Sequence, residues 1–351
     1  MLLVFGVAAM IWGAGRLLRW PPALAWGLIA LEWLAVFLAH LVLPDGHGLR
    51  AATGGAGPES PVLWGLIGAF AVVAVLYARG LDWLRARAKP PVVAGGGARP
   101  GAFSEGELNR YARHIVLREL GGPGQKRLKQ AKVLVIGAGG LGSPVLLYLA
   151  AAGVGRIGVV DDDAVDGSNL QRQVIHSDAA IGLPKVQSAA ERMRGLNPYV
   201  EVLPYERRLD EAGAAALFAD YDVVIDGTDN FATRYLVNRA AVAAGKPLIS
   251  GAIAQWEGQV SVFDPASGGP CYQCVFPEAP AEGLAPSCSE AGVVGPLPGV
   301  IGAMMALEAV KLIAGAGHVL RGEMLIYDGL WGESRKIAVK RRDDCPVCGA
   351  G

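Results

Sequence analysis

The sequence predicts an α/β domain built on a doubly wound, mostly parallel sheet, preceded by a membrane anchor of two or three transmembrane helices. Strand-like apolar runs alternate with helical segments between residues 132 and 251, and this alternation is typical of a parallel sheet. A glycine-rich turn, residues 137–142, follows the first of these strands. The chain is 52% hydrophobic, and its apolar excess is concentrated before residue 90, as expected for a membrane-anchored protein.

Two long apolar runs near the N-terminus predict membrane spans. Residues 23–43 are interrupted only by Glu32 and His40, and residues 61–78 carry no charge. Each run is long enough to cross a bilayer, which takes about 20 residues. Residues 2–15 form a shorter run, either a first span or a signal-like segment. Ionisable groups inside a membrane are costly, so Glu32 and His40 could have a function. In the favoured interpretation, Glu32 packs against a partner helix and His40 lies near the membrane interface.

Basic residues predict the orientation of the anchor. Arg16 and Arg19 follow the first run, and residues 44–60 contain Arg50 against Asp45 and Glu59. By the positive-inside rule, this distribution places the C-terminal part in the cytoplasm with either two or three spans. We therefore expect a multi-pass protein of the inner (cytoplasmic) membrane, in contact with lipid. The basic residues after the third run are Arg79, Arg85, Arg87 and Lys89.

A Pro/Gly-rich linker over residues 89–102 predicts the domain boundary. It separates an anchor, residues 1–88, from a C-terminal domain, residues 103–351. Ser104 and Glu107 have the spacing of a capping box, which predicts a helix over residues 105–119. Parallel strands are predicted near residues 132–136, 156–160, 200–204, 222–226 and 247–251, followed by strand alternation over 258–264, a helix over 299–314, and closing antiparallel strands over 323–328 and 334–340.

The glycine turn has the spacing of a phosphate-binding loop. Gly137, Gly139 and Gly142 form G-x-G-x-x-G ahead of a predicted helix over residues 143–152, and Asp161 ends the second strand. Glycines let the backbone approach a phosphate, a helix N-terminus offers free N–H groups, and the acid can hold ribose hydroxyls. The motif indicates a nucleotide without identifying it. A nicotinamide-dependent oxidoreductase shares the motif, and a glycine-rich turn that binds no ligand is the alternative.

Charged residues further along the chain favour a triphosphate over a nicotinamide. Arg172, Lys185 and Arg113 supply cations, and Asp229 follows the fourth predicted strand. Cations balance the charge that grows on pyrophosphate, and a carboxylate can hold Mg²⁺. Each residue alone fits an ordinary surface charge, but the joint pattern predicts ATP with Mg²⁺. A hydride-transfer enzyme needs no such cluster of cations, so the NAD(P)-dependent oxidoreductase is disfavoured.

Ordered motifs are spread over residues 104–351. They are Arg110-Tyr-x-Arg113, Gly137-x-Gly-Gly-x-Gly142, Asp161-x-Asp163, Ser168-Asn-Leu-Gln-Arg172-Gln173, Gly182-x-Pro-Lys185, Thr228-Asp-Asn230, Cys271-x-x-Cys274, Ser287-Cys288-x-Glu-Ala-Gly292-Val-Val-Gly295 and Cys345-x-x-Cys348. In these motifs the chain resembles the MoeB/ThiF/HesA family, bacterial relatives of the ubiquitin-activating enzymes. The resemblance does not cover residues 1–100, and a membrane anchor is not part of the usual soluble enzyme.

The resemblance implies ATP-dependent adenylylation of a ubiquitin-like sulfur-carrier protein. The C-terminal Gly-Gly carboxylate of the carrier attacks the α-phosphate of ATP, giving an acyl-adenylate and pyrophosphate. We expect a MoaD-type carrier of molybdenum cofactor biosynthesis, with a ThiS-type carrier of thiazole synthesis as the alternative. We also expect a homodimer, and a separate sulfurtransferase or cysteine desulfurase, because no rhodanese-like domain follows Gly351. The net charge of zero argues against a nucleic-acid partner.

The resemblance also implies roles for individual residues. Asp161 binds the ribose, and Asp229 binds Mg²⁺ or orients the site of the attacking carboxylate. Arg113 matches the arginine that reaches the nucleotide of the other subunit. The implied phosphate ligands are Asn169, Arg172 and Lys185. The full implied ATP site comprises Gly137, Gly139, Gly140, Gly142, Asp161, Asp163, Asn169, Arg172, Gln173, Lys185, Thr228, Asp229 and Asn230.

Two C-x-x-C pairs, Cys271 with Cys274 and Cys345 with Cys348, have the layout of a tetrahedral four-cysteine zinc site. With four protein ligands no position is left for water, so the metal is expected to be structural and to attach the C-terminal tail to the domain. A pair of redox dithiols is the alternative.

The fifth cysteine, Cys288, has two interpretations. It is either a nucleophile that forms a thioester or acyl-persulfide with the carrier, as in some relatives, or a dispensable residue in a loop, as in the MoeB-like branch. Its neighbours Ser287, Ser289 and Glu290 supply no cation to lower its pKa, which favours the second interpretation slightly.

Overall fold

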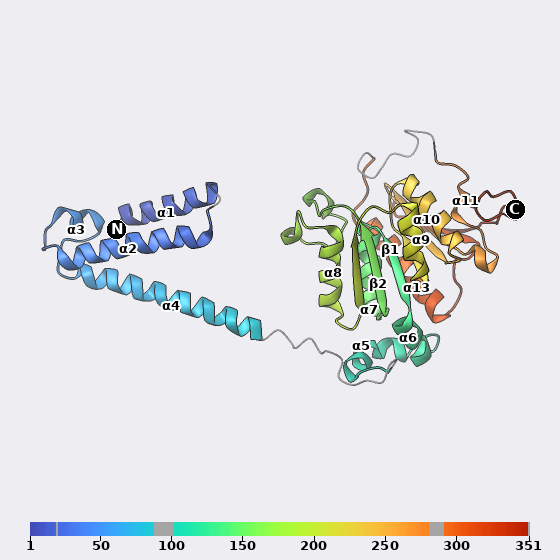
Figure 1. Ribbon diagram of the computed structural model, residues 1–351, viewed down its shortest axis with the longest axis horizontal. Helices are drawn as coiled ribbons and strands as arrows, with labels where there is room; N and C mark the ends of the chain where they lie inside the picture. Colours follow the sequence, from blue (N-terminus) through green and yellow to red (C-terminus); the bar gives the residue numbers. More distant parts are fainter. Residues whose placement is uncertain (19, 88–101, 281–290, 350–351) are drawn as a thin grey trace. The chain divides into compact units, whose positions relative to one another are not determined.

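The computed structural model describes residues 1–18, 20–87, 102–280 and 291–349. The chain separates into two compact units, Met1–Val93 and Ala94–Gly351, and each is described by itself (Figure 1). The predicted linker, residues 89–102, falls almost entirely outside the described residues. The predicted domain bounds therefore stay a prediction.

The N-terminal unit consists of apolar helices. By length and composition, Ala23–Val42 and Ser60–Leu81 are candidate membrane spans, and only 11% of each stretch is buried inside the unit. Their apolar side chains therefore face outward, as lipid-facing side chains do. α4 continues well past residue 78, where the apolar run ends. The helices are α1 (Leu2–Leu17), α2 (Pro22–Val42), α3 (Gly48–Thr53) and α4 (Ser60–Arg87).

A glycine on α4 allows α2 and α4 to pack closely. A Cβ atom at Gly68 would lie 2.0 Å from the ring of Trp33, so a side chain at this position would push the helices apart. The Trp33 ring stacks on Phe37 with centroids 5.4 Å apart, and its Nε1–H donates to the carbonyl of Trp64 at 3.1 Å. α2 and α4 thus form a helical hairpin through aromatic packing against a small residue.

A buried polar cluster joins α2, α3 and the start of α4. The ring nitrogens of His40 lie 2.9 Å from Ser60 Oγ and 2.8 Å from Thr53 Oγ1. Arg50, only 3% exposed, pairs with Asp45 at 2.7 Å. These partners compensate the burial of His40 and Arg50, and the predicted place of His40 near the membrane interface stays a prediction.

The C-terminal unit is built on one eight-stranded sheet, in the order β3-β2-β1-β4-β5-β6-β7-β8. β1 to β5 pair in parallel, and β5 to β8 pair antiparallel. The predicted α/β class and the change to antiparallel closing strands are confirmed. The strands are β1 (Lys132–Ile136), β2 (Arg156–Asp161), β3 (Glu201–Glu206), β4 (Val223–Asp226), β5 (Leu248–Ala254), β6 (Glu257–Phe263), β7 (Glu323–Asp328) and β8 (Glu333–Ala338).

Helices cover both faces of this sheet (Figure 1). α7, α8 and α13 contribute to one core, and α9 and α10 to the other. The helices are α5 (Glu105–Ile115), α6 (Gly121–Gln130), α7 (Gly142–Ala152), α8 (Lys185–Leu196), α9 (Glu211–Ala219), α10 (Phe231–Ala243), α11 (Tyr272–Val275) and α13 (Pro296–Ala314); Gly167–Asn169, Asp178–Ala180 and Pro265–Ser267 are single 3₁₀ turns.

α13 is also apolar and long enough to cross a membrane, but half of this apolar stretch is buried inside the unit. It packs on α7, β5 and β6, so its apolar side chains belong to the core of the domain. The helix begins at Pro296, three residues before the predicted start, because proline suits the first turn of a helix.

The helix predicted over residues 105–119 ends four residues early, at Ile115, and a separate helix follows it. The capping box of Ser104 and Glu107 is confirmed, with both reciprocal hydrogen bonds present. α5 ends at Ile115, and α6 begins at Gly121. Gly121 has φ of +61°, in the left-handed region that glycine favours, and the chain turns there into a second helix.

Candidate functional site

The glycine turn at the end of β1 brings backbone segments into close contact. Gly137 has φ of +94°, which favours glycine. A Cβ atom at Gly142 would lie 1.9 Å from the carbonyl oxygen of Gly137, so a larger residue would force α7 away from β1. Gly142 therefore serves the packing of helix on strand, and it lies outside the cavity lining described next.

A cavity of about 1140 Å³ opens at the carboxyl ends of β1, β2 and β4. The chain order reverses between β1 and β4, and ligands of open α/β sheets bind at such a switch point. The cavity continues past the glycine turn toward residues 252–259 and 272–280. The predicted residues that line it are Gly137, Gly139, Gly140, Asp161, Asp163, Arg172, Gln173, Lys185, Thr228, Asp229 and Asn230.

Two acids and a lysine connect the glycine turn to α8. Asp161 accepts hydrogen bonds from the N–H groups of Ala138 at 2.7 Å and Asp163 at 2.9 Å. Burial raises the pKa of the Asp161 carboxyl above its usual range. Lys185, 5% exposed, donates from Nζ to Asp163 Oδ2 at 2.6 Å. These bonds hold the turn, the end of β2 and the cation in one arrangement.

Arg172 and Gln173 line the cavity from the segment after β2. An Nη of Arg172 donates to Asn169 Oδ1 at 2.7 Å. Asn169 itself lies outside the lining and orients Arg172, and its predicted contact with a phosphate stays a prediction. Gln173 is 5% exposed, and its Oε1 has no hydrogen-bond partner among the described residues. A buried acceptor without a partner is costly, and a donor group on a bound ligand would satisfy it.

The loop after β4 presents an exposed carboxylate at the start of α10. Asp226 accepts hydrogen bonds from the N–H of Thr228 at 3.0 Å and its Oγ1 at 2.7 Å. Asn230 accepts from the N–H of Thr233 at 2.8 Å and so caps α10. Asp229 is exposed. Asn230 was expected to bind ATP; it lines the cavity, but one of its side-chain atoms serves the cap.

His176 was not singled out from the sequence, yet it supports the cavity. Its Nδ1 lies 2.9 Å from Ser188 Oγ on α8, and its Nε2 lies 2.9 Å from the carbonyl of Ala138 in the glycine turn. Burial lowers the pKa of this imidazole, which favours the neutral ring. His176 therefore links the glycine turn to the helix that begins with Lys185. A single histidine with no spacing pattern offers no sequence signal for this role.

Of two further expected catalytic residues, one lies outside the cavity lining and the other outside the described residues. Arg113 is exposed on α5 and is outside the lining of the cavity in its own chain. Cys288 falls within residues 281–290, outside the described residues. Both roles stay predictions.

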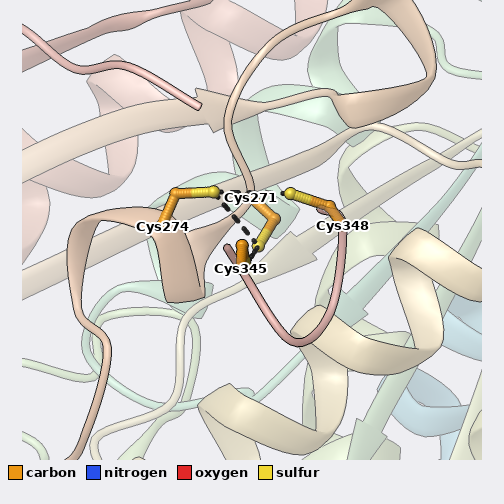
Figure 2. Close-up of side chains that lie close together, drawn as sticks. All are labelled: Cys271, Cys274, Cys345 and Cys348. Carbon is orange, nitrogen blue, oxygen red and sulfur yellow. Dashed lines mark hydrogen bonds between the residues drawn. The ribbon is translucent and has the colours of Figure 1, made fainter. Parts of the chain in front are cut away.

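The four cysteines of the two C-x-x-C pairs meet in one buried cluster (Figure 2). Their sulfur atoms are 3.9 Å apart for Cys271 and Cys274, 3.6 Å for Cys271 and Cys345, and 3.4 Å for Cys274 and Cys348. Zn–S bonds of about 2.3 Å in a tetrahedron place sulfurs roughly 3.8 Å apart, whereas a disulfide needs about 2.05 Å. The cluster therefore fits a structural zinc ion better than two disulfides.

Neighbouring donors also suit thiolate ligands. Asn238 Nδ2–H points to Cys271 Sγ at 3.7 Å, and the backbone N–H of Arg342 points to Cys274 Sγ at 3.4 Å. Such outer hydrogen bonds stabilise negative charge on metal-bound sulfur.

A switch-point cavity with a glycine turn, a buried lysine, a half-buried arginine and an exposed carboxylate defines a nucleotide-binding α/β enzyme. The chain belongs to the ThiF family, which matches residues 111–347. The resemblance found in the motifs is therefore confirmed, and the chain is an adenylyltransferase of this family.

Three known proteins illustrate the relationship. The chain is 51% identical over 251 residues to the sulfur carrier protein adenylyltransferase of Thermus thermophilus, covering 70% of this chain and 93% of the relative. It is 52% identical over 248 residues to the probable adenylyltransferase/sulfurtransferase MoeZ of Mycobacterium tuberculosis, covering 70% of this chain and 63% of MoeZ. The crystal structure of E. coli MccB with MccA-N7isoASN superposes with a TM-score of 0.62 at 23% identity, covering 70% of this chain and 76% of that one, and supports the fold alone.

Proposed function

We propose that the protein uses ATP to adenylylate the C-terminal Gly-Gly carboxylate of a ubiquitin-like sulfur-carrier protein, of the MoaD type used in molybdenum cofactor biosynthesis. The main support is one cavity that gathers the glycine turn, Arg172, Lys185 and Asp229, in a chain half identical to a named sulfur carrier protein adenylyltransferase. The cavity continues toward residues 252–259. An extended Gly-Gly tail, which has no side chains, is proposed to lie in this continuation.

The reaction needs positioning and charge stabilisation more than proton transfer. A carboxylate oxygen of the carrier forms a bond to the α-phosphorus of ATP, while the bond from that phosphorus to the bridging oxygen breaks and pyrophosphate leaves. The carboxylate is already a nucleophile, so no general base is required. Lys185 and Arg172 hold the phosphates and balance the charge that moves onto pyrophosphate.

Mg²⁺ is proposed to bind with ATP at Asp229. Three neighbouring carboxylates, Asp161 to Asp163, also lie within 4.8 Å of one another, but Asp161 accepts backbone N–H groups and Asp163 pairs with Lys185. Asp229 is exposed, and in the described part of the chain its carboxylate has no hydrogen-bond partner. The metal would neutralise phosphate charge and orient the triphosphate.

A homodimer is proposed for the same reaction. Arg113 is exposed and lies outside the cavity lining of its own chain, so a second copy is proposed to bring it to a nucleotide. The sulfur that follows adenylylation is proposed to come from a separate sulfurtransferase or cysteine desulfurase.

We expect carrier-dependent exchange of radioactive pyrophosphate into ATP by the full-length protein in detergent. A MoaD-type carrier should support exchange, and the same carrier without its terminal Gly-Gly should reduce it by about a hundredfold or more, because the nucleophile is displaced from the α-phosphate. A ThiS-type carrier run in parallel tests the alternative. Exchange that is equal without any carrier would contradict the proposal, and preference for the ThiS-type carrier would move the enzyme to thiazole synthesis.

The anchor is proposed to hold the enzyme at the inner membrane with its C-terminal unit in the cytoplasm. The support is the pair of candidate spans, α2 and α4, with outward-facing apolar side chains. We expect the exchange activity to sediment with membranes and to resist a high-salt wash, because apolar burial does not weaken with ionic strength. A version lacking residues 1–88 is the comparison. Release of the full-length protein by salt alone would contradict membrane insertion.

A further inference from the structure

Arg234, in the first turns of α10, is only 5% exposed, whereas arginine is rarely so buried without a partner. Its guanidinium donates to the backbone carbonyl of Thr228 and, at 2.8 Å, to that of Gly251. It also lies 3.3 Å from Ser250 Oγ. One side chain therefore binds both the loop after β4 and the strand β5.

Thr228 is held from two sides. Asp226 binds the N–H and the hydroxyl of Thr228, and Arg234 binds its carbonyl. Oδ2 of Asp226 lies 3.9 Å from the guanidinium and has no hydrogen-bond partner among the described residues. Asp226 is 1% exposed, so each of the two buried charges needs the other. The backbone is therefore fixed at Thr228, immediately before Asp229.

The same guanidinium connects the loop after β4 to a second wall of the cavity. Thr228 and Asp229 of the loop line the cavity. Residues 252–254 of β5 also line it, and they directly follow Ser250 and Gly251, which Arg234 contacts. The spacing between the carboxylate and this wall therefore depends on the contacts of Arg234.

We propose that Arg234 is a positioning residue for adenylylation, which acts by fixing the direction in which Asp229 faces the cavity. This inference rests on the proposed function, because Asp229 has a role only if the cavity binds Mg²⁺ and ATP. The planar guanidinium bonds to two carbonyls and one hydroxyl at once, and a lysine ammonium, a compact point charge, cannot reproduce this fork.

The test is Arg234→Lys in the full-length protein, assayed by pyrophosphate exchange with a recombinant MoaD-type carrier. We expect kcat to fall about tenfold to a hundredfold, since small displacements near reacting groups have effects of this size. The Mg²⁺ concentration for half-maximal exchange should rise several-fold, and the KM for the carrier should change little. Arg239→Lys is the matched control, because Arg239 lies on the same helix and forms an exposed pair with Glu211.

A double variant separates positioning from folding. If Arg234 acts through Asp229, then Asp229→Ala combined with Arg234→Lys should be within about twofold of Asp229→Ala alone. The inference would be overturned if the double variant lost activity by the product of the two single-variant losses. A lowered melting temperature of Arg234→Lys with unchanged kcat and Mg²⁺ dependence would overturn it too. Full activity of Asp229→Ala would remove Asp229 from the site and overturn the inference with it, whereas a lack of carrier-dependent exchange by the unaltered protein would be a failure of the proposed function.

Asp226→Asn with Arg234→Gln provides a second route should Arg234→Lys not fold. This pair leaves no uncompensated buried charge but loses the guanidinium contacts to Thr228 and Gly251. The same fall in kcat and rise in Mg²⁺ requirement are expected. Normal values of both in this folded variant would also overturn the inference.

Discussion

Asp229→Ala is expected to reduce carrier-dependent pyrophosphate exchange by about a hundredfold or more, because removal of one group that stabilises developing charge costs about that much. Asp229 is exposed, and in the described part of the chain its carboxylate makes no hydrogen bond, so the truncation should leave the melting temperature nearly unchanged. The measurement is kcat for exchange at saturating ATP, with a Mg²⁺ titration.

Asp220→Ala is the matched control. Asp220 is exposed at the end of α9, away from the cavity lining, so the same chemical change should leave exchange as in the unaltered protein. Normal exchange by Asp229→Ala would show that Mg²⁺ and the attacking carboxylate are held by other groups. A loss of exchange in both variants would point to a general effect of removing surface charge.

Cys345→Ser is expected to release the zinc ion and to destabilise the C-terminal unit. Cys271 and Cys274 belong to α11 and its N-cap, while Cys345 and Cys348 belong to the tail. A zinc ion bound by all four would therefore join two distant parts of the chain. Structural zinc sites bind with apparent free energies on the order of 10 kcal/mol, so the melting temperature should fall strongly. Zinc content per chain and thermal unfolding are the measurements.

Cys288→Ser is the control for this experiment. It makes the same substitution at the fifth cysteine, outside both C-x-x-C pairs, and should keep zinc content at about one ion per chain. Retention of zinc and of the melting temperature by Cys345→Ser would contradict a four-cysteine site. Recovery of two intramolecular disulfides from the native protein would instead favour the dithiol alternative.

Local sequence patterns were sufficient to predict most helices and strands and most of the residues that line the cavity. The strands over 132–136 and 323–328 were predicted with the bounds that the structure has, because buried strands carry continuous apolar runs and turns carry glycine. The capping box of Ser104 and Glu107 involves residues three apart, and it too was readable. The helix predicted over residues 105–119 is four residues too long, because α5 ends at Ile115 with Val116 as its C-cap and no glycine or proline marks that end in the sequence.

The roles of individual site residues were harder to predict from the sequence. Gly142 closely approaches the backbone of Gly137 and so packs α7 on β1, and Asn169 orients Arg172. Their predicted contacts with ATP stay predictions. The spacing of a motif does not specify such contacts between backbone segments and side chains.

The sequence by itself determined the order of strands and helices, the apolar helices of the first unit, the glycine turn and the pairing of cysteines that can bind a metal, because each depends on residues close together in the chain. Only the tertiary structure decided how His176 joins the glycine turn to α8 and how Arg234 joins the loop after β4 to β5. These side chains act by satisfying buried polar groups of distant segments. The partners of His176 and Arg234 become neighbours only when the sheet assembles, so no local sequence pattern predicts these contacts.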